Sequence, residues 1–293
     1  MADVLWFNGR FTTTDERLLG VEDRGFQFGD AVYEVFKFLQ RRPIFLADHY
    51  HRLDHGLREI EIVNPWSEQA FAEVARELLA RTACDDGIVY IQVSRGETAR
   101  AHFYPDNMTP TALMYSRRFS FPDERKKERG IGVITTADLR WLHCDVKSVN
   151  LLANALAKKK AQRASADEAL LLSNGLVREG ASSSFFAVRR GGLVTHPLGA
   201  HILPGVVRDR VIGLAIAAKI SVDERPPRET ELLELDEAFI TSTTQGVMPI
   251  AEIDGRIIGN SRRGEITERL QRLLDEAELR DVTPVEARGS ARR

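Results

Sequence analysis

Apolar and polar residues alternate strictly over residues 31–39. One face of this segment carries Tyr33 and Lys37, and the other carries Val32 and Phe36. A period of two predicts a strand, because successive side chains of a strand point to opposite sides. We therefore expect one face of this strand to lie in a core.

Other patterns predict both strands and helices. The segments on either side of Asn8-Gly9 are strand-like, which predicts a hairpin. Apolar residues have helical spacing over 46–60, and Ser67 caps a second helix that runs to Leu79. Further strands are predicted over 87–94, 110–116, 131–136, 168–172, 184–188, 193–195 and 238–244, and further helices over 148–164, 206–220 and 267–279. Because the two types are interleaved, the fold class is α/β or α+β.

A charged stretch over 121–130, bounded by proline and glycine, is the best candidate for a linker. We therefore expect an N-terminal α/β domain over 1–119, a linker over 120–130 and a C-terminal domain over 131–283. The last ten residues, 284–293, have the composition of a flexible tail. A chain of 293 residues is long enough for two domains of this kind.

The composition argues against several classes of protein. The net charge of −2 gives no sign of nucleic-acid binding, and the apolar run 212–218 is far shorter than the roughly 20 residues of a membrane span. The N-terminus does not resemble a signal peptide. Cys84 and Cys144 are too few for a disulfide framework, and neither has metal-ligand spacing. We expect a cytoplasmic protein without a metal site, a nucleic-acid partner or a membrane partner.

Lys147 is the first candidate for chemistry. It lies between Val146 and Val149, where an apolar run meets the predicted helix. An apolar setting lowers the pKa of a lysine and makes the amine nucleophilic, as a Schiff-base lysine requires. The ordinary alternative is a lysine that extends to solvent, and Lys37 is a rival on a half-apolar strand face.

Other segments offer groups that bind a charged cofactor or substrate. Glu179, between a strand and a Gly/Ser turn, could hold a pyridine nitrogen. The predicted helix after Gly205 and the hydroxyls of 241–244 are candidate phosphate binders, as is Arg52. Each feature also has an ordinary structural interpretation. Glu179 could be a glutamate in a turn, the helix start a simple cap, 241–244 a polar turn and Arg52 a surface arginine.

Arg100 and His102 lie two residues apart, so in an extended segment they point the same way. Together they form a compact cationic clamp suited to a carboxylate. The alternative interpretation is that both residues are simply exposed in a loop and bind nothing.

Taken in order, these segments resemble the class-IV aminotransferases, the fold type IV enzymes that use pyridoxal 5′-phosphate (PLP), and in particular their D-amino-acid branch. The matching blocks span about residues 5 to 255: 23–35, 51–53, 95–102, 141–148, 179–183, 202–205 and 241–244.

The resemblance implies a smaller N-terminal α/β domain and a larger C-terminal pseudo-barrel domain. It implies that Lys147 carries PLP as a Schiff base and moves protons, and that Glu179 pairs with the pyridine nitrogen. The implied phosphate-binding groups are Arg52, the backbone of Val206 and Val207, and the hydroxyl of Thr243. The implied substrate-carboxylate groups are Tyr33, Arg100 and His102.

The resemblance also implies an activity and an assembly. The activity is ping-pong transfer of an amino group between D-amino acids, such as D-alanine or D-glutamate, and 2-oxo acids. In the family the loop with the Arg-x-His pair reaches in from the neighbouring subunit, which implies a homodimer. Ser184 is a departure, because the family often has asparagine there.

Three alternatives remain open at this point. An L-branched-chain aminotransferase shares the fold, although its Tyr-Glu segment usually continues with glycine rather than Val35. A lyase of the aminodeoxychorismate type keeps the lysine and the glutamate. A non-enzymatic α/β binding module is the third alternative.

Overall fold

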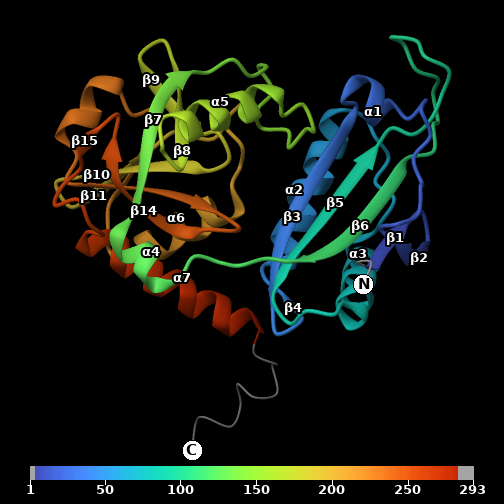
Figure 1. Cartoon of the computed structure of the whole chain (residues 1–293), viewed down its shortest axis with the longest axis horizontal. Coiled ribbons are helices and arrows are strands. Elements are labelled where there is room, and N and C mark those ends of the chain that lie inside the picture. Colours follow the sequence, from blue (N-terminus) through green and yellow to red (C-terminus); the bar gives the residue numbers. More distant parts are fainter. Residues whose placement is uncertain (1–3, 283–293) are drawn as a thin grey trace, which may run out of the picture. The chain divides into compact units, whose positions relative to one another are not determined.

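The computed structural model describes residues 4–282. The tail that we predicted over 284–293 lies outside the described residues. Helices and strands are interleaved along the chain, which confirms the mixed α/β class (Figure 1). The chain forms two compact units. Among the described residues, the first unit consists of 4–120, 146–150 and 278–282, and the second of 121–145 and 151–277.

The first unit is built on an antiparallel six-stranded sheet with the strand order β2-β1-β6-β5-β3-β4. Its strands are β1 (Val4–Phe7), β2 (Arg10–Thr13), β3 (Ala31–Leu39), β4 (Arg42–Pro43), β5 (Gly87–Ser94) and β6 (Thr111–Arg118). Its helices are α1 (Arg24–Phe28), α2 (Leu46–Glu59) and α3 (Glu68–Arg81). Figure 1 shows α2 lying along β3, with which it packs.

The alternation predicted for residues 31–39 is confirmed. Val32 and Phe36 of β3 are buried, whereas Tyr33 and Lys37 are only half-buried. The buried face packs against side chains of α2 and α3 in one apolar core, which includes Leu53. The predicted cap of α3 is also confirmed, since the Ser67 hydroxyl accepts a hydrogen bond from Ala70 N at 3.2 Å.

The second unit contains a nine-stranded sheet with the order β12-β11-β10-β13-β14-β7-β8-β9, and β15 pairs with β14. Its strands are β7 (Ile131–Ala137), β8 (Glu168–Ser173), β9 (Leu176–Gly180), β10 (Ser184–Arg189), β11 (Gly192–Thr195), β12 (Val222–Glu224), β13 (Glu237–Ser242), β14 (Gly246–Ile253) and β15 (Arg256–Ile257). Its helices are α4 (Glu124–Arg129), α5 (Leu152–Arg163), α6 (Val206–Ala217) and the 3-10 helix η1 (Glu229–Glu234), and most of α7 (Glu265–Val282) also belongs to it.

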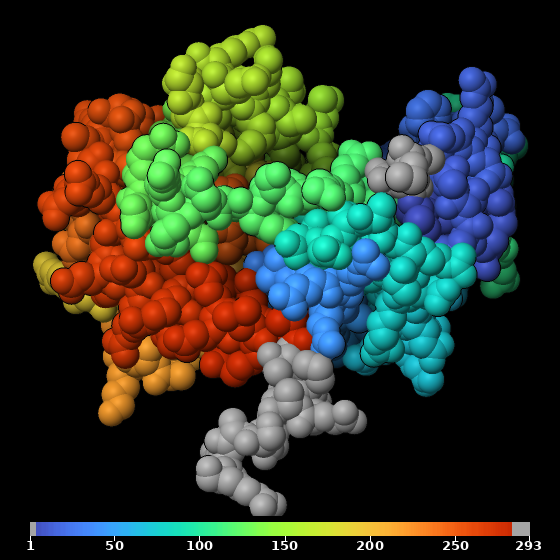
Figure 2. Space-filling view, turned by 60° about the horizontal axis from the view of Figure 1, so that its bottom comes forward, coloured from blue at the N-terminus to red at the C-terminus, as the bar shows by residue number. Residues whose placement is uncertain are grey.

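Residues 120–130, which we expected to link two domains, contain the short helix α4. Asp123 caps it, because its carboxylate accepts a hydrogen bond from Lys126 N at 2.8 Å. Lys127 pairs with Asp275 of α7 at 3.2 Å, so the two helices lie side by side on the second unit (Figure 2, green and red). The role of this stretch as a linker stays a prediction.

Within residues 4–282, none of the helices has both the length and the apolar character that crossing a bilayer requires.

Candidate functional site

Lys147 lies in the segment 146–150, which runs beside β3 in the first unit. Tyr33 N donates a hydrogen bond to Lys147 O at 2.9 Å, and Val149 N donates to Ala31 O at 3.2 Å. The prediction that a helix begins at Ser148 is therefore wrong, because α5 begins only at Leu152. The backbone groups before it bond to β3 instead, and these bonds position the lysine on the strand.

The amine of Lys147 lies next to the phenol of Tyr33. Lys147 Nζ donates to the Tyr33 hydroxyl at 3.2 Å and lies 4.3 Å from the centre of the tyrosine ring. The Tyr33 ring in turn stacks on Tyr90, with centroids 5.8 Å apart. This half-buried face of the sheet therefore combines an amine with a hydroxyl that can exchange a proton with it.

Lys37, the rival lysine, is on the same face of β3. Its amine forms an ion pair with Glu278, and both side chains are largely buried. An amine that is engaged by a carboxylate in this way is not available to react with an aldehyde. The geometry therefore favours Lys147 over Lys37 as the reactive lysine.

Arg52 of α2 binds a buried carboxylate. Its Nε and one terminal nitrogen donate to Glu34 at 2.8 and 2.6 Å, and His49 Nδ1 lies 3.0 Å from the same carboxylate. Burial alone would raise the pKa of Glu34, but the charges of Arg52 and His49 outweigh burial and hold that pKa well below its usual range. Burial lowers the pKa of His49, against the opposing effect of Glu34.

The expected phosphate contact of Arg52 stays a prediction. The structure shows that the guanidinium is held by Glu34 and is almost fully buried.

Arg100 and His102 lie in a loop without regular secondary structure, rather than in the extended segment we assumed. Both side chains are exposed and reach the ring of Phe28. The guanidinium of Arg100 lies 4.5 Å from the centre of that ring, and the ring of His102 lies 5.9 Å from it. The two side chains therefore contact the same ring, and their joint binding of a carboxylate stays a prediction.

In the second unit, Glu179 lies at the end of β9 and is buried. Arg140 donates a short hydrogen bond to Glu179 Oε1, and Leu203 N donates to the same oxygen at 3.1 Å. Arg140 also binds Asp138 through two nitrogens, at 2.9 and 2.8 Å. A carboxylate held from two sides in this way is fixed in position, as the partner of a ring nitrogen must be.

The start of α6 has the features of a phosphate site. Gly205 precedes the helix, and no side chain caps the N–H groups of Val206 and Val207. An added Cβ at Gly205 would lie 2.7 Å from the Ser184 hydroxyl, so only glycine allows β10 to approach the helix this closely. Ser184 pairs with Thr241 of β13, and half-buried Thr243 follows at the end of that strand.

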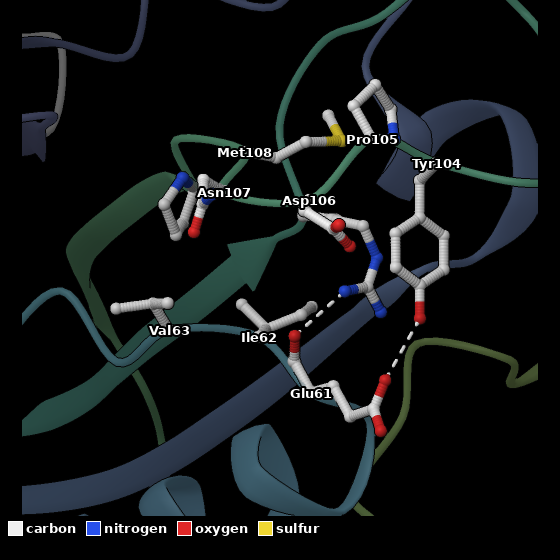
Figure 3. A pocket seen from close by; sticks show the side chains of 10 residues that line it. Glu61, Ile62, Val63, Tyr104, Pro105, Asp106, Asn107 and Met108 are labelled. Atoms are coloured by element: carbon white, nitrogen blue, oxygen red, sulfur yellow. Dashed lines mark hydrogen bonds between the residues drawn. The ribbon is translucent and has the colours of Figure 1, made fainter.

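A cavity of about 460 Å³ lies in the first unit, beside the loop that carries Arg100 and His102. Its lining residues come from two segments, 61–63 and 104–110, together with Arg95. Figure 3 shows the Tyr104 hydroxyl directed at the carboxylate of Glu61, 3.4 Å away. Neither Lys147 nor Tyr33 lines this cavity.

The sequence interpretation missed four residues that hold candidate groups: Phe28, Glu34, His49 and Arg140. A signal existed for Glu34, since a carboxylate on the apolar face of a strand must find a buried partner. His49 is three residues from Arg52 and therefore on the same face of α2. Among residues 4–282 no three side chains of the metal-binding types come together.

Comparison with known proteins gives a consistent result. The family model described as "Amino-transferase class IV" matches residues 31–253. A D-alanine aminotransferase of Bacillus licheniformis is 39% identical over 276 residues, which is 94% of this chain and 97% of that protein. A D-alanine aminotransferase of Listeria monocytogenes is 36% identical, with 92% and 94% covered.

Solved structures have the same fold. The T.th. branched-chain amino acid aminotransferase with pyridoxamine 5′-phosphate superposes with a TM-score of 0.89 at 26% identity, covering 96% of this chain and 95% of that one. A branched-chain aminotransferase of Escherichia coli also gives 0.89, at 23% identity and 95% coverage of each chain, and supports the fold alone. The matched blocks, the relatives and the fold agree, and this chain belongs to the class IV aminotransferases.

Proposed function

We propose that this enzyme transfers the amino group of D-amino acids, with D-alanine as a substrate, to 2-oxo acids, and that it uses PLP bound to Lys147. The observation that carries the proposal is the Lys147 amine beside the Tyr33 hydroxyl, at 3.2 Å. The relatives named D-alanine aminotransferase and the pyridoxamine 5′-phosphate of the T.th. structure support the substrate and the cofactor.

The donor groups of the chain fit the cofactor. The uncapped N–H groups of Val206 and Val207 provide positive partial charge for a phosphate, and Thr243 adds a hydroxyl. Glu179, fixed by Arg140, would pair with the pyridine nitrogen. Arg52 is the remaining group that we assign to the phosphate. PLP would supply an electron sink that makes the Cα–H bond of the bound amino acid acidic.

Lys147 then moves the proton. Its amine would take the proton from Cα of the bound amino acid and give it up again during transfer of the amino group, so that one residue would serve as base and as acid. The Tyr33 hydroxyl accepts a hydrogen bond from the Lys147 amine at 3.2 Å and would stabilise the amine while it holds the proton. β3 positions both groups, through Tyr33 N and the carbonyl of Lys147.

We assign Arg100 and His102, together with the hydroxyl of Tyr33, to the α-carboxylate of the substrate. A guanidinium provides a planar pair of donors, and the imidazole adds a third donor two residues away. With the carboxylate held at this clamp and the amino group at the cofactor, the position of the Lys147 amine would decide which enantiomer presents its Cα–H bond to the base.

An L-branched-chain amino acid is the second candidate substrate. The structural similarity to the T.th. branched-chain enzyme supports this candidate, since that structure matches almost the whole of this chain. The sequence favours the D-enantiomer instead, because relatives at 36–39% identity carry the D-alanine name.

We also propose that the enzyme is a homodimer and that it works in the cytoplasm. In that compartment the free thiols of Cys84 and Cys144 would stay reduced.

Steady-state assays of the PLP-loaded enzyme test the proposal. We expect D-alanine and 2-oxoglutarate to give pyruvate and glutamate with ping-pong kinetics. Turnover of L-leucine without turnover of D-alanine would contradict it. Release of pyruvate without any 2-oxo acid acceptor would instead indicate a lyase.

A further inference from the structure

The ring of Phe28, the last residue of α1, contacts both side chains of the predicted clamp. The Arg100 guanidinium lies 4.5 Å from the ring centre, and the His102 ring lies 5.9 Å away at a tilt of 59°. Arg100 also donates to the side chain of Gln27, the preceding residue of α1, at 3.2 Å. Two exposed side chains that could rotate independently therefore share one aromatic neighbour.

Arg24, at the start of α1, fixes the backbone of the same loop. Its guanidinium donates to the carbonyls of Ala101 and His102, at 2.8 and 3.4 Å, and lies 4.5 Å from the centre of the Phe28 ring. Its Nε binds Asp30 at 2.8 Å, and the side chain is almost fully buried. α1 thus holds the loop backbone through Arg24 and the loop side chains through Phe28.

Both ends of α1 are fixed, so the position of Phe28 is well defined. Asp23 caps the start, since its carboxylate accepts from Gly25 N and Phe26 N. Gly29 ends the helix with φ 69°, a left-handed conformation that suits glycine. An added Cβ there would lie 2.2 Å from the side chain of Asn150, three residues after Lys147.

The loop has little apolar support of its own. Phe103 is 81% exposed, and the continuation of the loop from Tyr104 to Met108 lines the cavity of Figure 3. The Tyr104 ring attaches that continuation to the protein, since it lies 3.7 Å from the guanidinium of Arg95. Phe28 is the side chain that both Arg100 and His102 contact, so we infer that the orientation of the two depends on it.

We propose that Phe28 is the positioning residue for recognition of the substrate carboxylate. Its ring holds the guanidinium and the imidazole against one shared surface before the substrate arrives, so that binding does not have to order two free side chains. The inference rests on the proposed function only in naming the substrate group. The positioning itself is a property of the loop in the free protein.

Kinetics of two substitutions test the inference. Phe28→Leu keeps an apolar side chain but removes the ring, and Phe28→Tyr keeps the ring. We expect Phe28→Leu to raise KM for D-alanine by about tenfold with little change in kcat, since cation–π contacts have about that effect on an equilibrium. Phe28→Tyr should behave like the parent enzyme. Phe26→Leu is the matched control, because Phe26 is on the same helix and 77% exposed.

Hydrogen–deuterium exchange gives a readout that needs no activity. We expect Phe28→Leu to speed exchange of the peptide over 98–104, because the guanidinium of Arg24, which bonds to the loop carbonyls, also lies against the Phe28 ring. Exchange over β5 should not change, and Phe28→Tyr and Phe26→Leu should leave both segments unchanged. Unaltered exchange over 98–104 in Phe28→Leu would overturn the positioning role, even in a protein that failed to turn over D-alanine. Faster exchange combined with inactivity of the parent enzyme on D-alanine would contradict the proposed function and leave the positioning intact.

A double-mutant cycle with Arg100→Ala separates positioning from general damage. If Phe28 acts through Arg100, the double variant has nearly the same KM as Arg100→Ala alone. Full additivity of the two effects, or a Phe28→Tyr variant as impaired as Phe28→Leu, would contradict the inference. A loss confined to kcat would contradict it as well.

Discussion

The guanidinium of Arg52 binds the carboxylate of Glu34 through two nitrogens, at 2.8 and 2.6 Å, in the core of the first unit. Glu34 is completely buried, and Arg52 nearly so. A buried carboxylate is costly unless it is paired, so Arg52 and His49 are what allow a glutamate on the apolar face of β3. The pair also fixes α2 on the strand that carries Tyr33.

Glu34→Gln should therefore destabilise the protein. The substitution removes the negative charge that Arg52 and His49 share in the core, and breaking a buried ion pair costs about 3 kcal/mol or more of the free energy of unfolding. Denaturant unfolding of the variant and the parent measures this difference. Glu59→Gln is the control. Glu59 is an exposed carboxylate on α2, the helix that carries Arg52, and its substitution should change stability very little. Equal effects of the two substitutions would show that the buried pair is not important for stability.

Stability should fall in two steps as the solution is acidified. Burial lowers the pKa of His49 below the ordinary 6.5, so the folded state resists protonation and loses stability as pH falls below that value. The pKa of Glu34 is also lower in the folded state, so its contribution is present above pH 4.5 and is lost as the pH falls further. Thermal unfolding between about pH 8 and about pH 3 measures both steps. His49→Gln should remove the upper step, and an unchanged upper step would refute this assignment.

Tyr33→Phe should slow the reaction more than it weakens binding of the cofactor. The substitution removes the hydroxyl that accepts a hydrogen bond from the Lys147 amine. Contributions of groups that assist proton transfer indicate a loss of about 100-fold in kcat. Binding of PLP, followed by absorbance, should be nearly unchanged. A large loss of PLP binding with normal kcat at saturating PLP would assign Tyr33 to the cofactor instead.

Arg140→Ala should weaken PLP binding. The substitution leaves Glu179 without its charged partner, so the carboxylate is no longer held where a pyridine nitrogen would meet it. We expect the Kd of PLP to rise by about tenfold or more, since a lost charge-assisted hydrogen bond costs about 1.5–3 kcal/mol. Equilibrium dialysis of PLP measures the effect, and Arg163→Ala at the exposed end of α5 is the control. An unchanged Kd would mean that Arg140 does not support the cofactor site.

Local patterns were sufficient for much of the fold. The alternation of β3 and the Ser67 cap of α3 depend on neighbours in sequence, so both could be predicted and are confirmed. The start of α5 could not be predicted, because residues 146–150 bond to β3, more than a hundred positions earlier in the chain. Helix propensity contains no information about such a distant partner.

In the candidate site, too, some features could be predicted from nearby residues and others depend on distant segments. Arg100 and His102 could be paired from their spacing, but the aromatic ring that they share comes from α1. Arg52 could be chosen as a bidentate cation, but its partner Glu34 depends on the packing of α2 on the sheet. Residue type predicted the candidates, and contacts between distant segments determined the partners.

The most direct test of the account is the paired substitution of Lys147 and Lys37 by alanine in PLP-treated protein. Lys147→Ala should lose both the visible absorbance band of lysine-bound PLP and the transamination of D-alanine, because it removes the amine beside Tyr33. Lys37→Ala should keep the band, since the Lys37 amine is engaged with Glu278. A Lys147→Ala protein that keeps the band, together with a Lys37→Ala protein that loses it, would contradict the central claim.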